Sequence, residues 1–525
     1  MGLYFNPDDT LLSEMLNTKV FVDKSEFIGL LNSNLGTENR NMCISRPRRF
    51  GKTMAAVMAA AYYSCGCNSR QLFEGLKISQ QPNWDVYLNK YNVLRLDIQG
   101  FYDKGLGERD VVDLLTEALK AEMQEEFPEI TFDNDMTLSQ AMQKVFSKTK
   151  RGFVVIMDEY DVLIRTQVSQ SVFSHYLLFL NDLFKSIEMR QVIKLAYITG
   201  ILPIVKERMQ SKLNNFTEYS MLKPGDMVEY IGFTRAEVEE LCAKHNMDLG
   251  ECLNWYDGYQ IKNKVDISAP YSVVSAMRSH EYTSHWTNTS SFECLRDYIN
   301  MDFDGIKSDV CKLMSGQSIR ICTELYNNTL SNFETKDDIF TYLIHLGYLS
   351  YNADTQMVQI PNREVMWEWK LSVDRSKKYR FIYEMIEESR DLLNATLEAD
   401  AERVAELIDR AHDTYTTALT YNNEGCLQSL MGIAYFYART DYNIVMELPS
   451  GRGFANMALL PKKEGLVPIV VELKWNKTTA EALNQIETKH YAKALENYDN
   501  NSILVAVNYD AQTKKHQCEI KRAKN

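Results

Sequence analysis

The chain has 525 residues, 45% of them hydrophobic and 25% charged, which is an ordinary composition for a globular protein. This length exceeds what one hydrophobic core supports, so we expect two or three domains. The net charge of −13 argues against a chain coated in nucleic acid, although it leaves room for local basic grooves.

The N-terminal sequence MGLYFNPDDT has neither the basic start nor the apolar run of a signal peptide, and the longest apolar stretch, around 54–63, is too short to span a bilayer. The ten cysteines form no Cys-x-x-Cys pair, which is typical of reduced thiols. We therefore expect a cytoplasmic protein with no membrane partner.

The first half of the chain alternates strand and helix patterns. Short apolar runs at 92–98, 152–159 and 192–201 predict buried strands, and the stretch 108–127 predicts a helix between them. This alternation predicts an α/β fold with a parallel sheet that helices cover on both faces.

The sequence CISRPRRFGKTM at 43–54 lies between a short apolar strand and an Ala-rich helix. This is the context of a phosphate-binding loop, in which Gly51 lets the backbone approach a phosphate, Lys52 reaches the outer phosphates and Thr53 ligates Mg²⁺. The usual pattern G-x-x-x-x-G-K-[ST] has glycine where Arg46 stands, and an ordinary helix start would show the same Gly-Lys-Thr.

The stretch FVVIMDEYD at 153–161 is an apolar strand that ends in two acids. In a Walker B strand, Asp158 would hold the Mg²⁺ shell and Glu159 would polarise the attacking water. Thr199 ends a further strand, where it would either sense the γ-phosphate or cap the next turn. Together with the loop, these residues predict an ATPase that uses ATP and Mg²⁺.

The motifs SRPRRFGKT, VVIMDEYD, YITGILPI and KLNNFTEYS resemble the AAA-ATPase-like proteins of bacteria and archaea, over roughly residues 4 to 290. In that family RPRRFGK replaces the usual loop pattern, so the resemblance implies that Arg46 is the family's own variant. It also implies an AAA-type P-loop core with a helical lid. Arg46, Arg48 and Arg49 would either bind phosphate or be solvated.

The region from about 230 to 370 is predicted to be mostly helical, and the polar basic segment 374–380 is a candidate linker. The predicted domains are an AAA-type core at 1–230, a helical lid and connector at 231–373, and a third domain at 374–525.

The last domain has a different order of elements. Helices are predicted at 397–419 and 424–438, followed by three strands, a helix that Thr478 and Glu481 start as a capping box, and two further strands. The three strands are predicted at 442–449, 453–461 and 467–475, the helix at 478–498 and the closing strands at 502–510 and 516–523.

Glu472 and Lys474 are two residues apart on a strand, so they point to one face. A solvated edge strand with an ion pair would explain them. The other interpretation is a PD-(D/E)XK nuclease core, in which an acid from the preceding strand and the Glu of E-x-K hold Mg²⁺ and the Lys orients or activates the water.

This region resembles the PD-(D/E)XK domain that commonly follows the AAA-ATPase-like domain, a restriction-endonuclease-like α/β fold. The family's Gly-Arg-Gly-x-x-Asp and Glu-x-Lys correspond here to 451–456 and 472–474, with Asn456 in place of the Asp, either as the natural residue or as an inactivating substitution. The resemblance adds three further motif residues, Gln485, Lys489 and Tyr491. Because an amide brings no negative charge, Asn456 weakens the predicted Mg²⁺ site.

Two more acids are candidate metal ligands. If 451–452 is a two-residue hairpin turn, Glu447 pairs with Asn456 and lies beside the metal position; otherwise it is a surface residue. Glu424 begins the preceding helix, either as an auxiliary ligand or as an ordinary N-terminal acid.

The residues from 452 to 525 include 12 basic and 8 acidic side chains, a net charge of +4 that suits either a phosphate backbone or a solvated face. The predicted function is an ATPase coupled to a nuclease-like domain that acts on DNA. Nucleic acid is the expected partner, and a second copy of the chain, in a homo-oligomer, is a further candidate partner. The alternatives are an ATP-driven switch whose degenerate nuclease fold only binds nucleic acid or a protein, and a protein-interaction regulator without a nucleic-acid role.

Overall fold

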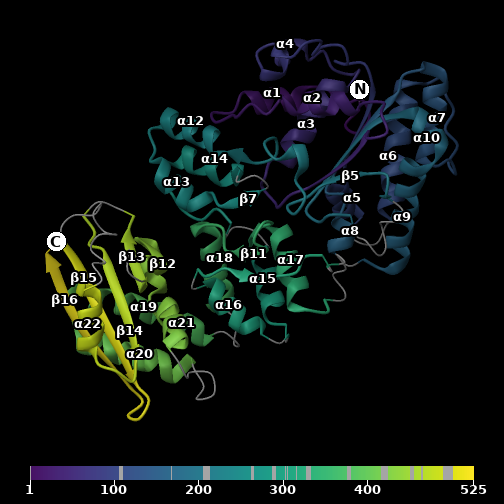
Figure 1. Ribbon diagram of the computed structural model, residues 1–525. Helices are drawn as coiled ribbons and strands as arrows, with labels where there is room; N and C mark the ends of the chain where they lie inside the picture. Colours follow the sequence, from purple (N-terminus) through teal and green to yellow (C-terminus); the bar gives the residue numbers. More distant parts are fainter. Residues whose placement is uncertain are drawn as a thin grey trace. The chain divides into compact units, whose positions relative to one another are not determined.

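The computed structural model divides the chain into two compact units, residues Met1–Asn288 with Arg320–Glu364 and residues Thr289–Ile319 with Val365–Asn525 (Figure 1). It describes all residues except 1, 106–109, 167, 205–212, 262–264, 287–290, 302, 304, 315, 325, 327–332, 375–379, 416–423, 450–453, 463–464, 489–500 and 525. The predicted boundaries at 230 and 373 stay a prediction.

A five-stranded parallel sheet forms the core of the first unit. Its strands are β1 (Asn41–Ser45), β2 (Asn92–Asp97), β3 (Phe153–Asp158), β4 (Ile193–Gly200) and β5 (Thr217–Tyr219). They lie in the order β2-β3-β4-β1-β5, with every pairing parallel. The predicted parallel α/β sheet is confirmed. Because β4 neighbours both β1 and β3, the ends of these three strands meet at one edge.

Helices pack on both faces of this sheet. Val155 and Met157 on one face of β3 belong to a core cluster that includes α6, α7 and α9, while α3 contacts β2, β3 and β4. α7 begins with a capping box between Thr137 and Gln140, which satisfies two end groups of the helix. The helices are α1 (Thr10–Leu16), α2 (Phe27–Asn34), α3 (Lys52–Tyr63), α4 (Arg70–Phe73), α5 (Ile98–Gly105), α6 (Val111–Glu126), α7 (Leu138–Thr149), α8 (Val162–Arg165), α9 (Gln170–Lys185) and α10 (Ile187–Val192).

The middle of the chain contains helices as predicted, but also two three-stranded sheets that the sequence did not predict. These sheets have the orders β6-β8-β7 and β10-β11-β9. Their strands have only two to four residues, so they carry little of the alternation that marks a strand. The strands are β6 (Phe233–Thr234), β7 (Tyr259–Ile261), β8 (Val265–Ser268), β9 (Ile319–Arg320), β10 (Ser350–Asn352) and β11 (Met357–Gln359). The helices are α12 (Arg235–His245), α13 (Leu249–Tyr256), α14 (Pro270–Ser279), α15 (Ser291–Ile299), α16 (Ile306–Met314), α17 (Lys336–Leu346) and α18 (Arg363–Asp374).

The second unit contains a five-stranded mixed sheet in the order β12-β13-β14-β15-β16, in which only β14 and β15 pair in parallel. One face packs against α19, α20 and α21, and the other packs against α22. The strands are β12 (Tyr442–Pro449), β13 (Phe454–Pro461), β14 (Ile469–Trp475), β15 (Asn501–Asp510) and β16 (Lys515–Lys524). The helices are α19 (Arg380–Glu398), α20 (Ala401–Tyr415), α21 (Glu424–Ala434) and α22 (Thr479–Thr488).

This order confirms the predicted restriction-endonuclease-like α/β architecture, with one missed helix. α19 was not predicted, and the helix expected from residue 397 is divided at Ala399, which has φ +63°. Most of the candidate linker falls on 375–379, outside the described residues.

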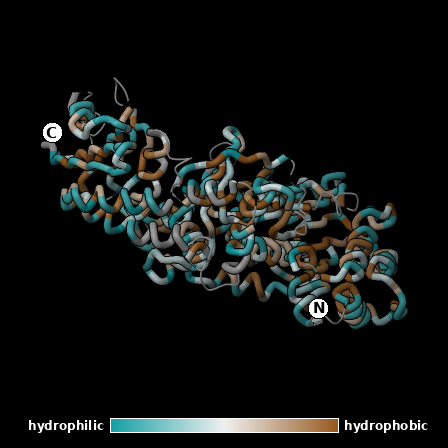
Figure 2. The backbone as a smooth tube through the Cα atoms, turned by 90° about the horizontal axis from the view of Figure 1, so that it is seen from below, coloured by the Kyte–Doolittle hydropathy of each residue, from teal (hydrophilic) through white to brown (hydrophobic). Residues whose placement is uncertain are grey.

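Along the helices, hydrophilic and hydrophobic segments alternate (Figure 2). Within the described part of the chain, no helix combines the length and the apolar character needed to cross a bilayer.

Candidate nucleotide site and nuclease-like site

The start of α3 has the geometry of a phosphate-binding loop. Gly51 adopts φ +90°, a conformation that favours glycine, and its Cα faces open space. Lys52 is buried, and its Nζ donates hydrogen bonds of 2.9 Å to the carbonyls of both Arg46 and Pro47. Burial lowers the pKa of Lys52, and the carboxylates of Glu159 and Asp158 oppose this effect. Lys52 therefore places a buried cation at the N-terminus of α3.

Asp158 joins the ends of β3 and β4 to the start of α3. Thr53 Oγ1, next to Lys52, donates to Asp158 Oδ2 at 2.6 Å, and the hydroxyl of Thr199 donates to Asp158 Oδ1. Three residues predicted from separate motifs are thus in direct contact. A threonine hydroxyl and a carboxylate are ligands that Mg²⁺ accepts, so these residues fit the predicted metal position.

Glu159 follows β3 and has φ +54°, which is uncommon for a residue with a side chain. Its carboxylate forms an ion pair with Arg165 of α8, and Arg165 Nε lies 3.1 Å from Asp161 Oδ2. Burial raises the pKa of Glu159, and Lys52 and Arg165 oppose this effect. Asp161 is fully buried and accepts the backbone N–H groups of Ile201 and Leu202, so its role is structural.

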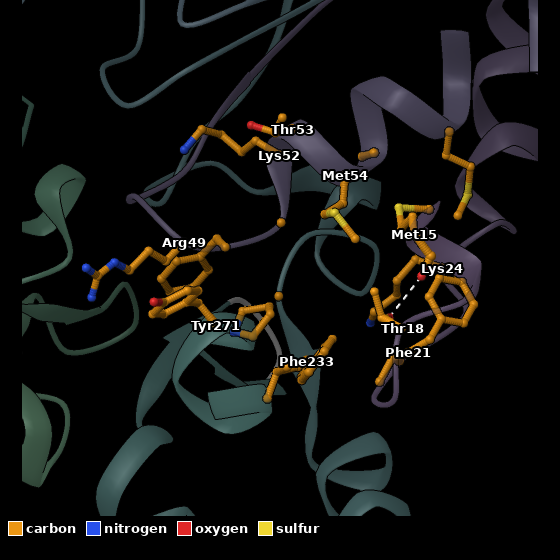
Figure 3. Close-up of a pocket in the computed structure, with 18 of the residues that line it drawn as sticks. Met15, Thr18, Phe21, Lys24, Arg49, Lys52, Thr53, Met54, Phe233 and Tyr271 are labelled. Atoms are coloured by element: carbon orange, nitrogen blue, oxygen red, sulfur yellow. Dashed lines mark hydrogen bonds between the residues drawn. The ribbon is translucent and has the colours of Figure 1, made fainter. Parts of the chain in front are cut away.

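Of the residues described so far, Gly51, Lys52, Thr53 and Glu159 border a cavity of about 610 Å³, a volume typical of small-molecule sites. In Figure 3, Lys52 and Thr53 lie at the start of α3, while Arg49 and Tyr271 lie together on one side of the pocket. The rest of the lining was not predicted from the sequence, and it is largely apolar. It includes Met15, Thr18, Val20, Phe21, Lys24, Phe233, Val274 and Arg278.

The three arginines of the loop have different surroundings. Arg46 is fully buried, and its Nη1 donates to the carbonyls of Ser45 and Tyr219 at 3.1 Å each. Arg46 does not line the cavity, whereas Arg48 and Arg49 do. Arg49 has φ +70°, and its guanidinium lies 4.7 Å from the centre of the Tyr271 ring. This placement favours a structural role for Arg46 and leaves Arg48 and Arg49 as candidate phosphate contacts.

Arg46 lies in a buried polar region together with Tyr197 and His345. Its Nε and Nη2, the hydroxyl of Tyr197 and Nδ1 of His345 have no hydrogen-bond partner among the described residues. Burial, with a smaller effect of the Arg46 charge, lowers the pKa of His345 to about 3, so His345 is neutral near pH 7. The C-terminal end of α17 also packs on the loop, because a Cβ at Gly347 would lie 2.8 Å from Pro47.

We expect the neutrality of His345 to make stability depend on pH. Between pH 6.5 and about 3 the unfolded chain binds a proton at His345 and the folded chain does not, so acidification favours unfolding. The free energy of unfolding should fall by about 1.6 kcal/mol between pH 6.5 and pH 5 from this group alone. Denaturant unfolding should show a decrease larger by this amount in the parent than in His345→Gln, because other buried histidines such as His516 destabilise both proteins on acidification. Equal pH dependences in the two proteins would contradict it.

In the second unit, Glu472 and Lys474 lie on one face of β14, as predicted. Lys474 Nζ donates to Glu472 Oε1 at 3.0 Å, and the two residues are 1% and 7% exposed. The interpretation as a solvated edge strand is wrong, because β14 lies between β13 and β15 and both charges are buried. A buried ion pair at the centre of a sheet is costly, which favours a functional reason for these charges.

The side chain of Asn456 extends the hydrogen bonding between β13 and β14 beyond their last backbone pair. The last paired residues are Met457 and Val471, and beyond them Asn456 Oδ1 accepts the N–H of Leu473 at 2.9 Å. The side chain at position 456 therefore reaches the β14 backbone between Glu472 and Lys474. Glu447 lies across from Asn456 in the β12–β13 register, but it is exposed and has φ +56°.

The other predicted nuclease residues are less well defined. Glu424 is the first residue of α21, and Gln485 lies on α22. The side chain of Glu424 is not described, and Lys489 and Tyr491 lie outside the described residues. In the described part of the chain, the one group of three carboxylate or histidine ligands within reach of a common ion is Asp110, Asp113 and His175, in the first unit. At the nuclease-like site, Asn456 on β13 lies near Glu472 on β14, and Glu472 accepts a hydrogen bond from Lys474. Among the described residues, no group of three carboxylate, histidine or cysteine ligands gathers there.

Comparisons with known proteins find family matches for two parts of the chain. A family described as a predicted AAA-ATPase matches residues 14–210, and the PD-(D/E)XK nuclease superfamily matches residues 422–519. No curated protein matches the chain. A similar solved structure is the Aeropyrum pernix ORC2 protein in ADPNP–ADP complexes, with 11% identity and a TM-score of 0.26 over 66% of this chain and 91% of that one. The chain therefore combines an AAA-ATPase-like domain with a C-terminal domain of the PD-(D/E)XK nuclease superfamily.

Proposed function

We propose that the protein binds and hydrolyses ATP with Mg²⁺ in the cavity at the start of α3. The hydrogen bond of 2.6 Å between Thr53 and Asp158, beside the buried Lys52, carries this proposal. The α3 N-terminus and Lys52 would hold the phosphates, while Thr53 and Asp158 would hold the metal. Arg48 and Arg49 would contribute charge at the cavity wall, and the apolar side formed by residues such as Phe21 and Phe233 would accept the base.

The Lys52→Ala protein should lose nucleotide binding. Because Lys52 is a buried cation at the start of α3 and lines the cavity, its removal takes charge-assisted hydrogen bonds from the phosphates. We expect the Kd for MgATP to rise by about 100-fold, equivalent to about 3 kcal/mol. Calorimetric titration measures this, with Lys148→Ala, an exposed lysine of α7, as the matched control. An unchanged Kd in a folded Lys52→Ala protein would show that the nucleotide site is elsewhere.

We further propose that the ATPase domain controls action on DNA by the C-terminal domain. The net charge of +4 between 452 and 525 and the membership of a nuclease superfamily support a DNA partner. Salt-dependent binding to DNA tests this, since each neutralised phosphate adds to the salt slope. Binding that is absent at low salt would favour a protein-interaction regulator.

A second candidate function is an ATP-driven switch whose nuclease fold binds nucleic acid or a protein without cleavage. One observation favours it. Asn456 Oδ1 is engaged with Leu473 N, and Glu472 is engaged with Lys474, so neither group is presented to solvent as a metal ligand. Cleavage assays with Mg²⁺ or Mn²⁺ on duplex, branched and single-stranded DNA separate the two candidates.

A further inference from the structure

The position of Glu159 depends on a chain of contacts that begins at β4. Asp161 Oδ2 accepts the N–H groups of Ile201 and Leu202 at 3.1 and 2.8 Å, directly after the end of β4. Tyr160 adds two bonds to the same segment, from its N–H to the carbonyl of Thr199 and from its hydroxyl to that of Leu202. The segment after β3 is therefore fixed to the end of β4.

Gly200 makes this close approach possible. A Cβ at residue 200 would lie 2.6 Å from Asp161 Oδ1 and 2.7 Å from the ring of Tyr160. These distances are too short for a side chain, so the sequence keeps glycine at this point of contact between β4 and the Walker B segment.

Arg165 extends the contacts from Asp161 to Glu159. Its Nε pairs with Asp161 Oδ2 at 3.1 Å, while its Nη2 donates to Glu159 Oε2. The Arg165 side chain is 11% exposed and that of Glu159 is 24% exposed, so water screens the pair only in part. The guanidinium is a rigid planar fork, so two anchored contacts fix its direction.

We propose that Arg165 is a positioning residue for Glu159 in ATP hydrolysis. The ion pair engages Glu159 Oε2 and leaves Oε1 to accept a proton from, or orient, a water at the cavity that Glu159 lines. The same contacts explain how a glutamate keeps φ +54°. An unfavourable backbone conformation persists where several contacts of the neighbouring residues hold it in place. The proposal rests on the proposed ATPase function.

Substitution of Arg165 by Gln should lower kcat at least tenfold and leave the Kd for MgATP within about twofold, because Arg165 does not line the cavity. Arg165→Lys should give an intermediate kcat, since one ammonium can pair with Glu159 or Asp161 but does not reproduce the fork. Arg190→Gln, which removes an exposed pair with Glu38, is the matched control and should leave kcat unchanged.

A double-mutant cycle distinguishes positioning from a general structural role. If Arg165 acts through Glu159, Arg165→Gln should have little further effect on single-turnover hydrolysis in a Glu159→Gln background. A crystal structure of the Arg165→Gln protein should show the Glu159 carboxylate displaced.

Three results would overturn the proposal: kcat of Arg165→Gln at or above that of the parent, an equal loss of rate in both backgrounds, or an unmoved Glu159. If Arg165→Gln does not fold, the same comparison is made with Arg165→Lys, whose hydrolysis rates are measured in the parent and in the Glu159→Gln background. A parent protein that binds no ATP or does not hydrolyse it would instead refute the proposed function.

Discussion

Glu159→Gln is expected to retain ATP and to hydrolyse it about 10²–10⁴-fold more slowly than the parent, the range that a positioned general base contributes. Glu159 lines the cavity one residue after Asp158, and its second carboxylate oxygen is the group that can orient water. Glutamine has nearly the same shape but does not accept a proton, so binding should be preserved while the chemical step is lost.

Two measurements check this expectation. Calorimetry should give the same Kd for MgATP in both proteins, and phosphate release under saturating ATP should show the loss in kcat. Asp161→Asn is a poor substitute for this test, because Asp161 holds the backbone at 201 and 202 and its loss should reduce stability. Hydrolysis at the parent rate by a folded Glu159→Gln protein would assign the catalytic role to another residue.

The strands that carry the nucleotide site could be predicted because buried parallel strands are continuous apolar runs. The ends of those runs then locate Asp158 and Thr199, and the parallel order brings them to Thr53. The same patterns located β12 to β16, because a mixed sheet with helices on both faces also has apolar central strands.

Other features could not be read from the sequence. The cavity wall formed by Met15, Phe21 and Lys24 has no motif, and only the tertiary fold brings it opposite α3. The burial of Arg46 could not be predicted either. Three arginines in one loop have the same sequence signal, and only the structure shows that Arg46 is fully buried. The role of Arg165 depends on a side-chain contact with the residue six positions earlier across a left-handed turn, which no periodicity marks.

Asn456→Asp is expected to raise affinity for Mg²⁺ or Mn²⁺ at least about tenfold, equivalent to about 1.4 kcal/mol, and to switch on or increase DNA cleavage. The bond from Leu473 N shows that the side chain at 456 reaches β14 between Glu472 and Lys474. An aspartate can accept this N–H with one oxygen and present the other to a cation beside Glu472, as a hard metal ion prefers. Lys474 would then exchange its carboxylate partner for the water or the scissile phosphate.

The control for charge alone is Asn443→Asp, an exposed residue of β12 in the same sheet, which should change neither metal affinity nor cleavage. Adding Glu472→Gln to Asn456→Asp should remove the gained activity, because a single carboxylate would remain on β13 and β14. Calorimetry with each metal and a gel assay on duplex, branched and single-stranded DNA measure both effects. A folded Asn456→Asp protein that neither binds metal more tightly nor cuts any of these substrates would mean that the buried Glu472–Lys474 pair is structural. The C-terminal domain would then be a binding module that the ATPase controls.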